Sequence, residues 1–123
     1  MAKILVIDDS RFQRKLISSV LEEKGYQVLT AGDGREGFAV ARQESPDLVI
    51  CDLLMPGIDG FNFLRMVREE GLATPVLVFT SDIQKTTRDI CLELGACDVL
   101  NKPVKGEALI PAVERAIGSA KKS

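Results

Sequence analysis

Five short apolar runs alternate with segments of helical periodicity along the chain, and this alternation limits the possible folds more than any other feature. Each apolar run is typical of a strand, and a helical pattern follows it. Strands separated by helices pair in parallel, with helices on both faces of the sheet. The expected strands are 4–7, 26–31, 48–51, 75–80 and 98–101. We therefore predict an α/β fold, a doubly wound five-stranded parallel sheet with five helices.

Capping residues mark the expected helix starts, because their side-chain oxygens accept the free amide hydrogens of a first turn. The expected N-caps are Ser10, Asp33, Asp59 and, for a fourth helix over 83–95, either Ser81 or Asp82. Apolar residues at helical spacing predict the buried faces. They are Phe12, Leu16, Val20 and Leu21, then Phe38 and Ala41, then Phe61, Leu64 and Val67, then Ile90 and Leu94.

The last helix carries Leu109, Ile110, Val113 and Ile117 at helical spacing, but Pro111 lies within this pattern. A proline past the first turn removes a backbone hydrogen bond. Either the helix begins near Ile110 or an earlier turn is bent. We expect one domain over 1–118 and a short flexible tail over 119–123.

The composition excludes several classes of function. The chain has no histidine, which excludes a histidine-based triad, a histidine metal site and an internal phosphohistidine. Its 16 basic and 18 acidic residues give a net charge of −2, which predicts neither nucleic acid nor a membrane surface as a partner. The three cysteines lack C-x-x-C spacing, and we expect them to be reduced. No apolar stretch reaches membrane-spanning length, so we expect a cytoplasmic location.

Polar side chains end or directly follow four of the five expected strands. Asp8 and Asp9 follow the first, Asp52 the third, Thr80 the fourth and Lys102 the fifth. In the strand order 2-1-3-4-5 these four strands are neighbours, and sites in such sheets lie at the carboxyl ends of the strands. We therefore expect three carboxylates, a hydroxyl and an ammonium group in one shallow pocket.

Each of these residues also has a purely structural interpretation. Asp52 could cap the turn after its strand, Asp8 or Asp9 could cap the first helix, and Lys102 could simply be solvated. Three carboxylates at one edge of a sheet repel one another, however, and need a cation. The combination therefore favours a functional site.

Carboxylate oxygens in a chain without histidine favour a hard cation such as Mg²⁺. Asp8, Asp9 and Asp52 could hold this ion together with several waters. A carboxylate can also accept a phosphoryl group as an acyl phosphate. Asp52 is the better nucleophile, because it stands alone on the central strand. Lys102 offers a positive charge to the phosphoryl oxygens, and Thr80 offers a hydrogen bond.

The order of these motifs resembles that of receiver domains of two-component response regulators. The resemblance covers about residues 3–118, and it rests on Asp8-Asp9, Asp52 before Leu-Leu-Met-Pro-Gly, Thr80-Ser81 and Lys102-Pro103. It implies a flavodoxin-like fold. It also implies a phosphoacceptor signalling switch that is not an enzyme, beyond self-catalysed phosphorylation and dephosphorylation.

The resemblance further implies partners and ligands. A sensor histidine kinase or a phosphotransfer protein would donate phosphate from its phosphohistidine to Asp52. A downstream protein would bind the face formed by the fourth helix, fifth strand and fifth helix. Lys102 would pair with the phosphoryl group, and Thr80 would report it. The direct Mg²⁺ ligands would be Asp9, Asp52 and the backbone carbonyl of Leu54, with Asp8 acting mainly through water.

Val99 departs from the family pattern. Family members often carry Tyr or Phe three residues before the lysine of the fifth strand, and that ring moves when the threonine shifts. A valine cannot make this movement. We hypothesise that the loop after Thr80 and the helix 83–95 carry the signal instead.

Two other functions use related residues. Haloacid-dehalogenase-like phosphatases also combine an Asp nucleophile, Mg²⁺, a hydroxyl and a lysine, but they need D-x-D after a strand. The segment Asp52-Leu53-Leu54 lacks the second aspartate. A flavodoxin needs a Ser/Thr/Gly-rich phosphate loop after the first strand, where Asp9-Ser10-Arg11-Phe12 would repel a phosphate.

Overall fold

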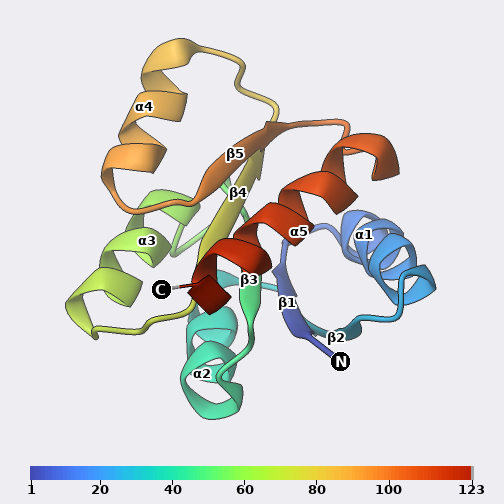
Figure 1. Ribbon diagram of the computed structural model, residues 1–123. Coiled ribbons are helices and arrows are strands. Elements are labelled where there is room, and N and C mark those ends of the chain that lie inside the picture. Colours follow the sequence, from blue (N-terminus) through green and yellow to red (C-terminus); the bar gives the residue numbers. More distant parts are fainter. Residues whose placement is uncertain (123) are drawn as a thin grey trace.

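The computed structural model describes the backbone of residues 1–122 and the side-chain exposure of residues 1–119. Within these residues, five parallel strands form one sheet in the order β2-β1-β3-β4-β5, which confirms the predicted order (Figure 1). The strands are β1 (Lys3–Ile7), β2 (Gln27–Ala31), β3 (Leu48–Asp52), β4 (Val76–Thr80) and β5 (Asp98–Asn101). The helices are α1 (Arg11–Glu23), α2 (Gly34–Glu44), α3 (Gly60–Glu69), α4 (Lys85–Glu93) and α5 (Gly106–Lys122).

Helices cover both faces of the sheet, and each face has its own apolar core (Figure 1). Successive residues of a strand point to opposite faces. Ile4 and Val6 therefore pack with α1 and α5, whereas Leu5 and Ile7 pack with α2, α3 and α4. Burial on both faces explains why the central strands are continuous apolar runs.

Three predicted N-caps are confirmed. The hydroxyl of Ser10 accepts a hydrogen bond from the amide of Gln13 at 3.2 Å, and Asp33 and Asp59 cap α2 and α3 in the same way. Each cap satisfies an amide of a first helical turn. These helices therefore begin close to the strand ends, which keeps the loops around the expected site short.

Two helices bury only part of the expected face: Leu21 is buried and Leu94 packs against the core, as predicted, but three other side chains do not. Along a helix, consecutive side chains lie about 100° apart. After Leu16 and after Ile90, the next residue along the chain is buried instead, a shift that hydrophobic spacing alone does not detect. The misplaced side chains, which are exposed, are Phe12 (72%), Leu16 (44%) and Ile90 (43%). The residues buried instead are Ile17 in α1 and Cys91 in α4.

The expected start of the fourth helix was wrong. Helix α4 begins at Lys85, and its N-cap residue Gln84 makes no side-chain capping bond. The Asp82 carboxylate accepts hydrogen bonds from the Gln84 amide at 3.0 Å and from the Thr87 hydroxyl at 2.6 Å. Asp82 therefore holds the loop before the helix, rather than capping a helix that begins at residue 83.

Helix α5 begins at Gly106, not near Ile110, and Pro111 lies inside it with an exposed side chain. The helix extends to Lys122, and Ser123 lies outside the described residues. The division into a domain over 1–118 and a flexible tail over 119–123 stays a prediction. No helix within residues 1–122 is long and apolar enough to cross a membrane.

Gly60, the first residue of α3, packs against the loop that follows Asp52. A Cβ atom on Gly60 would lie 2.7 Å from the Leu53 Cα and 3.0 Å from the Asp52 carbonyl oxygen. We expect Gly60→Ala to lower the free energy of unfolding by about 1–3 kcal/mol, because backbone atoms must move to admit the methyl group.

The control for this prediction is Gly118→Ala in α5, where, within the described residues, an added Cβ would have no atom within 4 Å beyond its chain neighbours and the helix's own backbone. It should raise the free energy of unfolding by about 0.5–1 kcal/mol through helix propensity. Urea denaturation measures both variants. A Gly60→Ala protein as stable as the unsubstituted chain would show that the packing of α3 on this loop is not close.

Candidate functional site

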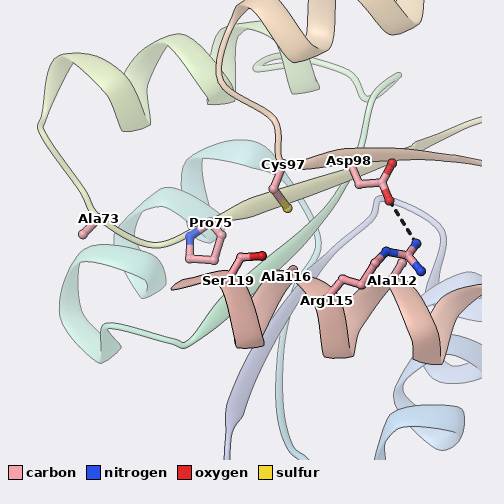
Figure 2. A pocket seen from close by; sticks show the side chains of 8 residues that line it. All are labelled: Ala73, Pro75, Cys97, Asp98, Ala112, Arg115, Ala116 and Ser119. Carbon is pink, nitrogen blue, oxygen red and sulfur yellow. Dashed lines mark hydrogen bonds and ion pairs between the residues drawn. The ribbon is translucent and has the colours of Figure 1, made fainter. Parts of the chain in front are cut away.

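A cavity of about 720 Å³ lies at the edge of the sheet away from the predicted site (Figure 2). Ala73 and Pro75 line it just before β4, and Cys97 lines it just before β5. These residues stand at the amino ends of strands. The side chain of Arg115 crosses this region and pairs with Asp98 at 3.5 Å. The cavity is therefore separate from the polar groups at the carboxyl ends.

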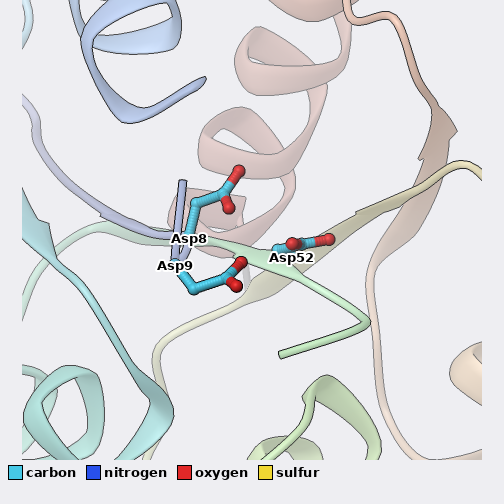
Figure 3. Close-up of side chains that lie close together, drawn as sticks. All are labelled: Asp8, Asp9 and Asp52. Atoms are coloured by element: carbon cyan, nitrogen blue, oxygen red, sulfur yellow. The ribbon is translucent and has the colours of Figure 1, made fainter. Parts of the chain in front are cut away.

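The three predicted carboxylates meet at the carboxyl edge of the sheet (Figure 3). Asp8 and Asp9 follow β1, Asp52 ends β3, and one oxygen from each lies within 4.8 Å of the others. Asp8 is fully buried and Asp52 is 3% exposed, while Asp9 is exposed. Buried carboxylates this close repel strongly, so the arrangement favours a bound cation.

Lys102 places a positive charge beside this cluster of carboxylates. Its Nζ lies 3.1 Å from Asp52 Oδ1 and 3.9 Å from Asp8 Oδ2. The ammonium group also lies 5.0 Å from the centre of the Phe79 ring, which limits the directions the side chain can take. The Lys102 amide donates to the Thr80 carbonyl at 2.8 Å, so β4 fixes the start of the loop that carries it.

The Asp8 side chain indicates that the charge of Lys102 alone does not neutralise the three carboxylates. Its Oδ1 accepts from the Ser10 amide at 2.9 Å, but its buried Oδ2 has no hydrogen-bond partner within the described residues. Burial first, and then the charge of Asp52, raise the pKa of Asp8 to about 6, against the lowering effect of the Ser10 amide. An orphaned oxygen beside two other carboxylates fits a hard divalent cation such as Mg²⁺.

The raised pKa of Asp8 predicts a pH dependence of stability without metal. The folded protein holds this proton up to about pH 6, whereas the ordinary pKa is 3.8. The unfolded chain therefore releases the proton first, and the free energy of unfolding falls as the pH rises from about 4 to about 6. The expected loss is on the order of 3 kcal/mol.

Urea denaturation at a series of pH values in a chelator measures this loss. Asp8→Asn should remove this contribution and leave a flatter profile. Mg²⁺ added above pH 6 should restore stability in the unsubstituted protein, because a ligand that binds the folded state stabilises it. An unchanged slope in Asp8→Asn would contradict the assignment.

Thr80 and Leu54 were both predicted to act beside Asp52, and the structure buries the first and exposes the second. Thr80 ends β4 beside β3, is 1% exposed, and its hydroxyl accepts from the Asp82 amide at 3.1 Å. This bond leaves the proton of the hydroxyl available to another acceptor. Leu54 follows Asp52 by two residues, and its side chain is 59% exposed.

Two contacts of the site were not predicted from the sequence. An Nη atom of Arg14 donates to the Asp8 carbonyl at 2.7 Å and so fixes the backbone that carries Asp8 and Asp9. Phe79 lies beneath Lys102. Arg14 stands one turn after the Ser10 cap, which places it near the strand end, but an arginine there usually faces solvent. Only the folded structure shows that this arginine binds the Asp8 carbonyl and does not simply face solvent.

Comparisons with known proteins agree with this geometry. Residues 4–114 match the response regulator receiver domain family. The chain is 41% identical over 115 residues to the protein PilH of Pseudomonas aeruginosa, covering 92% of this chain and 95% of PilH. The chemotaxis protein CheY4 of Vibrio cholerae superposes with a TM-score of 0.89 at 36% identity, covering 94% of this chain and 98% of that one.

A third relative is a longer protein. The alkaline phosphatase synthesis transcriptional regulatory protein PhoP of Bacillus subtilis is 39% identical over 101 residues, which is 82% of this chain but 42% of PhoP. Receiver domains in general bind Mg²⁺, are phosphorylated by histidine kinases and act on downstream targets. The match to this family does not favour the phosphatase alternative. The chain belongs to the response regulator receiver domain family and is a phosphoacceptor signalling switch.

Proposed function

We propose that Asp52 accepts the phosphoryl group in this switch, with a phosphohistidine of a sensor histidine kinase or a phosphotransfer protein as the donor. The observation that carries this proposal is the buried Asp52 carboxylate, with the Lys102 ammonium 3.1 Å from its Oδ1. In the reaction an Asp52 oxygen attacks phosphorus. A P–O bond forms, the P–N bond of the donor breaks, and the imidazole keeps that electron pair.

Asp8, Asp9, Asp52 and the Leu54 carbonyl would hold Mg²⁺ in this site. The close approach of the three carboxylates and the orphaned Oδ2 of Asp8 support the assignment. When bound, the ion would neutralise charge on the phosphoryl oxygens. The exposure of Asp9 leaves this side of the cluster open to a donor and to water.

Lys102 and Thr80 would bind the product. An acyl phosphate carries about one more negative charge than the carboxylate it replaces, so new contacts must supply the free energy of switching. Lys102 already lies against the reacting carboxylate and can follow the phosphoryl oxygens. The Thr80 hydroxyl has a proton that it can donate to the phosphoryl oxygens. Thr80 ends β4, which pairs with β3, the strand that ends in Asp52.

The exposed Leu54 argues against catalytic turnover. A haloacid-dehalogenase-like phosphatase needs its second aspartate at this position, and the Leu54 side chain carries no group that could protonate a leaving alcohol. We therefore propose that the chain is a switch and not an enzyme. We also propose that its downstream protein binds the face of α4, β5 and α5, and that it works in the cytoplasm with its donor.

Incubation with acetyl phosphate and Mg²⁺ tests the proposed function. Intact mass spectrometry should show one phosphoryl group per chain, and EDTA should prevent its appearance. In parallel, p-nitrophenyl phosphate measures turnover and should yield no sustained release of nitrophenol. Repeated hydrolysis without a stable phosphorylated form would instead indicate a phosphatase.

A further inference from the structure

Asp82 connects three elements next to the proposed phosphorylation site. Its amide donates to the Thr80 hydroxyl at the end of β4, at 3.1 Å. Its carbonyl accepts from the Asn101 side chain at the end of β5, at 3.3 Å. Its carboxylate accepts from the Gln84 amide and from the Thr87 hydroxyl of α4. The loop between β4 and α4 is thus held at one residue.

The bond from Thr87 is the strongest of these contacts by its geometry. The hydroxyl lies 2.6 Å from Asp82 Oδ2, within the range of charge-assisted O–H···O⁻ bonds. Thr87 is 9% exposed and lies in the first turn of α4, whose N-cap residue makes no side-chain capping bond. The same bond lowers the pKa of Asp82, which keeps the carboxylate charged. The first turn of α4 therefore depends on Asp82 for its attachment to β4.

Helix α4 is also attached to β5, through Arg88, which follows Thr87 in the chain. Arg88 donates to the Val99 carbonyl at 2.9 Å and pairs with Asp98 at 3.6 Å. The Val99 side chain is buried and too short to swing between the core and the surface. A signal that reaches α4 in this chain thus needs a route other than a ring at position 99.

We propose that Thr87 is a positioning residue whose hydrogen bond to Asp82 couples the state of Thr80 to the first turn of α4. This inference rests on the proposed function. To reach a phosphoryl group on Asp52, the Thr80 side chain rotates about its Cα–Cβ bond, and its oxygen moves away from the Asp82 amide, which loses its present acceptor. An unsatisfied amide is costly, so the loop 81–84 rearranges. The Asp82 carboxylate then transmits this movement to α4 through Thr87.

The test compares two threonines on the same helical turn. Thr87→Val removes the hydroxyl that bonds Asp82 and keeps the branched shape. Thr86→Val is the matched control, because the Thr86 hydroxyl is exposed and, among the described residues, bonds only the Gln84 side chain, at 3.5 Å. Thr87→Ser keeps the hydroxyl and should behave as the unsubstituted chain. Amide chemical shifts of residues 85–93, recorded before and after acetyl phosphate with Mg²⁺, report the coupling, and intact mass reports phosphorylation.

We expect Thr87→Val to take up phosphate at Asp52 as the unsubstituted chain does, while its phosphorylation-dependent shifts in α4 fall at least about twofold. Thr86→Val and Thr87→Ser should keep the full shifts. Full shifts in Thr87→Val would overturn the inference and leave the proposed function intact. If the unsubstituted chain takes up no phosphate, the proposed function and this inference are both wrong. Should Thr87→Val not fold, Asp82→Asn replaces it, with the same reduction expected and unchanged shifts overturning the inference.

Discussion

Replacement of Asp52 by Asn should abolish phosphorylation by acetyl phosphate, lowering the rate by several orders of magnitude. The amide has nearly the same volume as the carboxylate, but it offers phosphorus no anionic oxygen. We expect no uptake at the neighbouring Asp8, whose side chain is fully buried and whose Oδ1 accepts the Ser10 amide. Intact mass spectrometry with Mg²⁺ present measures the uptake.

Asp47→Asn is the control for Asp52→Asn. Asp47 lies immediately before β3, at the opposite end of the same strand, and its exposed carboxylate accepts the Lys3 amide at 2.8 Å. This variant should be phosphorylated at the unsubstituted rate. If Asp52→Asn still took up one phosphoryl group at a comparable rate, another carboxylate would be the acceptor and the assigned role of Asp52 would be wrong.

Replacement of Lys102 by Met should produce the second large effect, in two measurements. The rate of phosphorylation should fall about 10²–10³-fold, because a positioned cation that meets charge developing in the transition state is lost. Without metal, the free energy of unfolding should also fall, by about 1–3 kcal/mol, since the buried carboxylates of Asp8 and Asp52 lose their nearest cation. The exposure of the Lys102 side chain, 22%, keeps this loss below that of a fully buried pair.

Lys105→Met provides the matched control three residues away. Lys105 is exposed in the loop before α5, and its substitution removes the same charge from the chain without touching the acidic cluster. Phosphorylation and stability should both stay near their unsubstituted values. Equal losses in the two variants would mean that net charge, and not the position of Lys102, is responsible.

The sheet and the site were predictable because both follow from short segments of the chain. Each strand lies within one residue of its expected range, since apolar runs between polar turns mark strands buried on both faces. The strand order then brings Asp8, Asp9, Asp52 and Lys102 together, as the distances between them confirm. The role of each residue in binding metal or phosphate stays a prediction.

Helix faces and the start of α4 were less predictable, because contacts with other elements decide them. Phe12 and Leu16 lie four residues apart, as do Ile17 and Leu21, so spacing alone correctly placed Leu21 in the core but could not tell that Phe12 and Leu16 are exposed and Ile17 is buried. Helix α4 begins at Lys85, later than expected. The Asp82 carboxylate accepts the Thr87 hydroxyl instead of capping an earlier helix start.

The most direct measurement is the position of the phosphoryl group along the chain. After treatment with acetyl phosphate and Mg²⁺, proteolysis and peptide mass spectrometry should find it on the peptide that contains Asp52, at that residue. Peptides that contain Asp8 and Asp9 should carry none. A phosphoryl group on either of those residues, or on Thr80, would contradict the assignment of Asp52 as the acceptor.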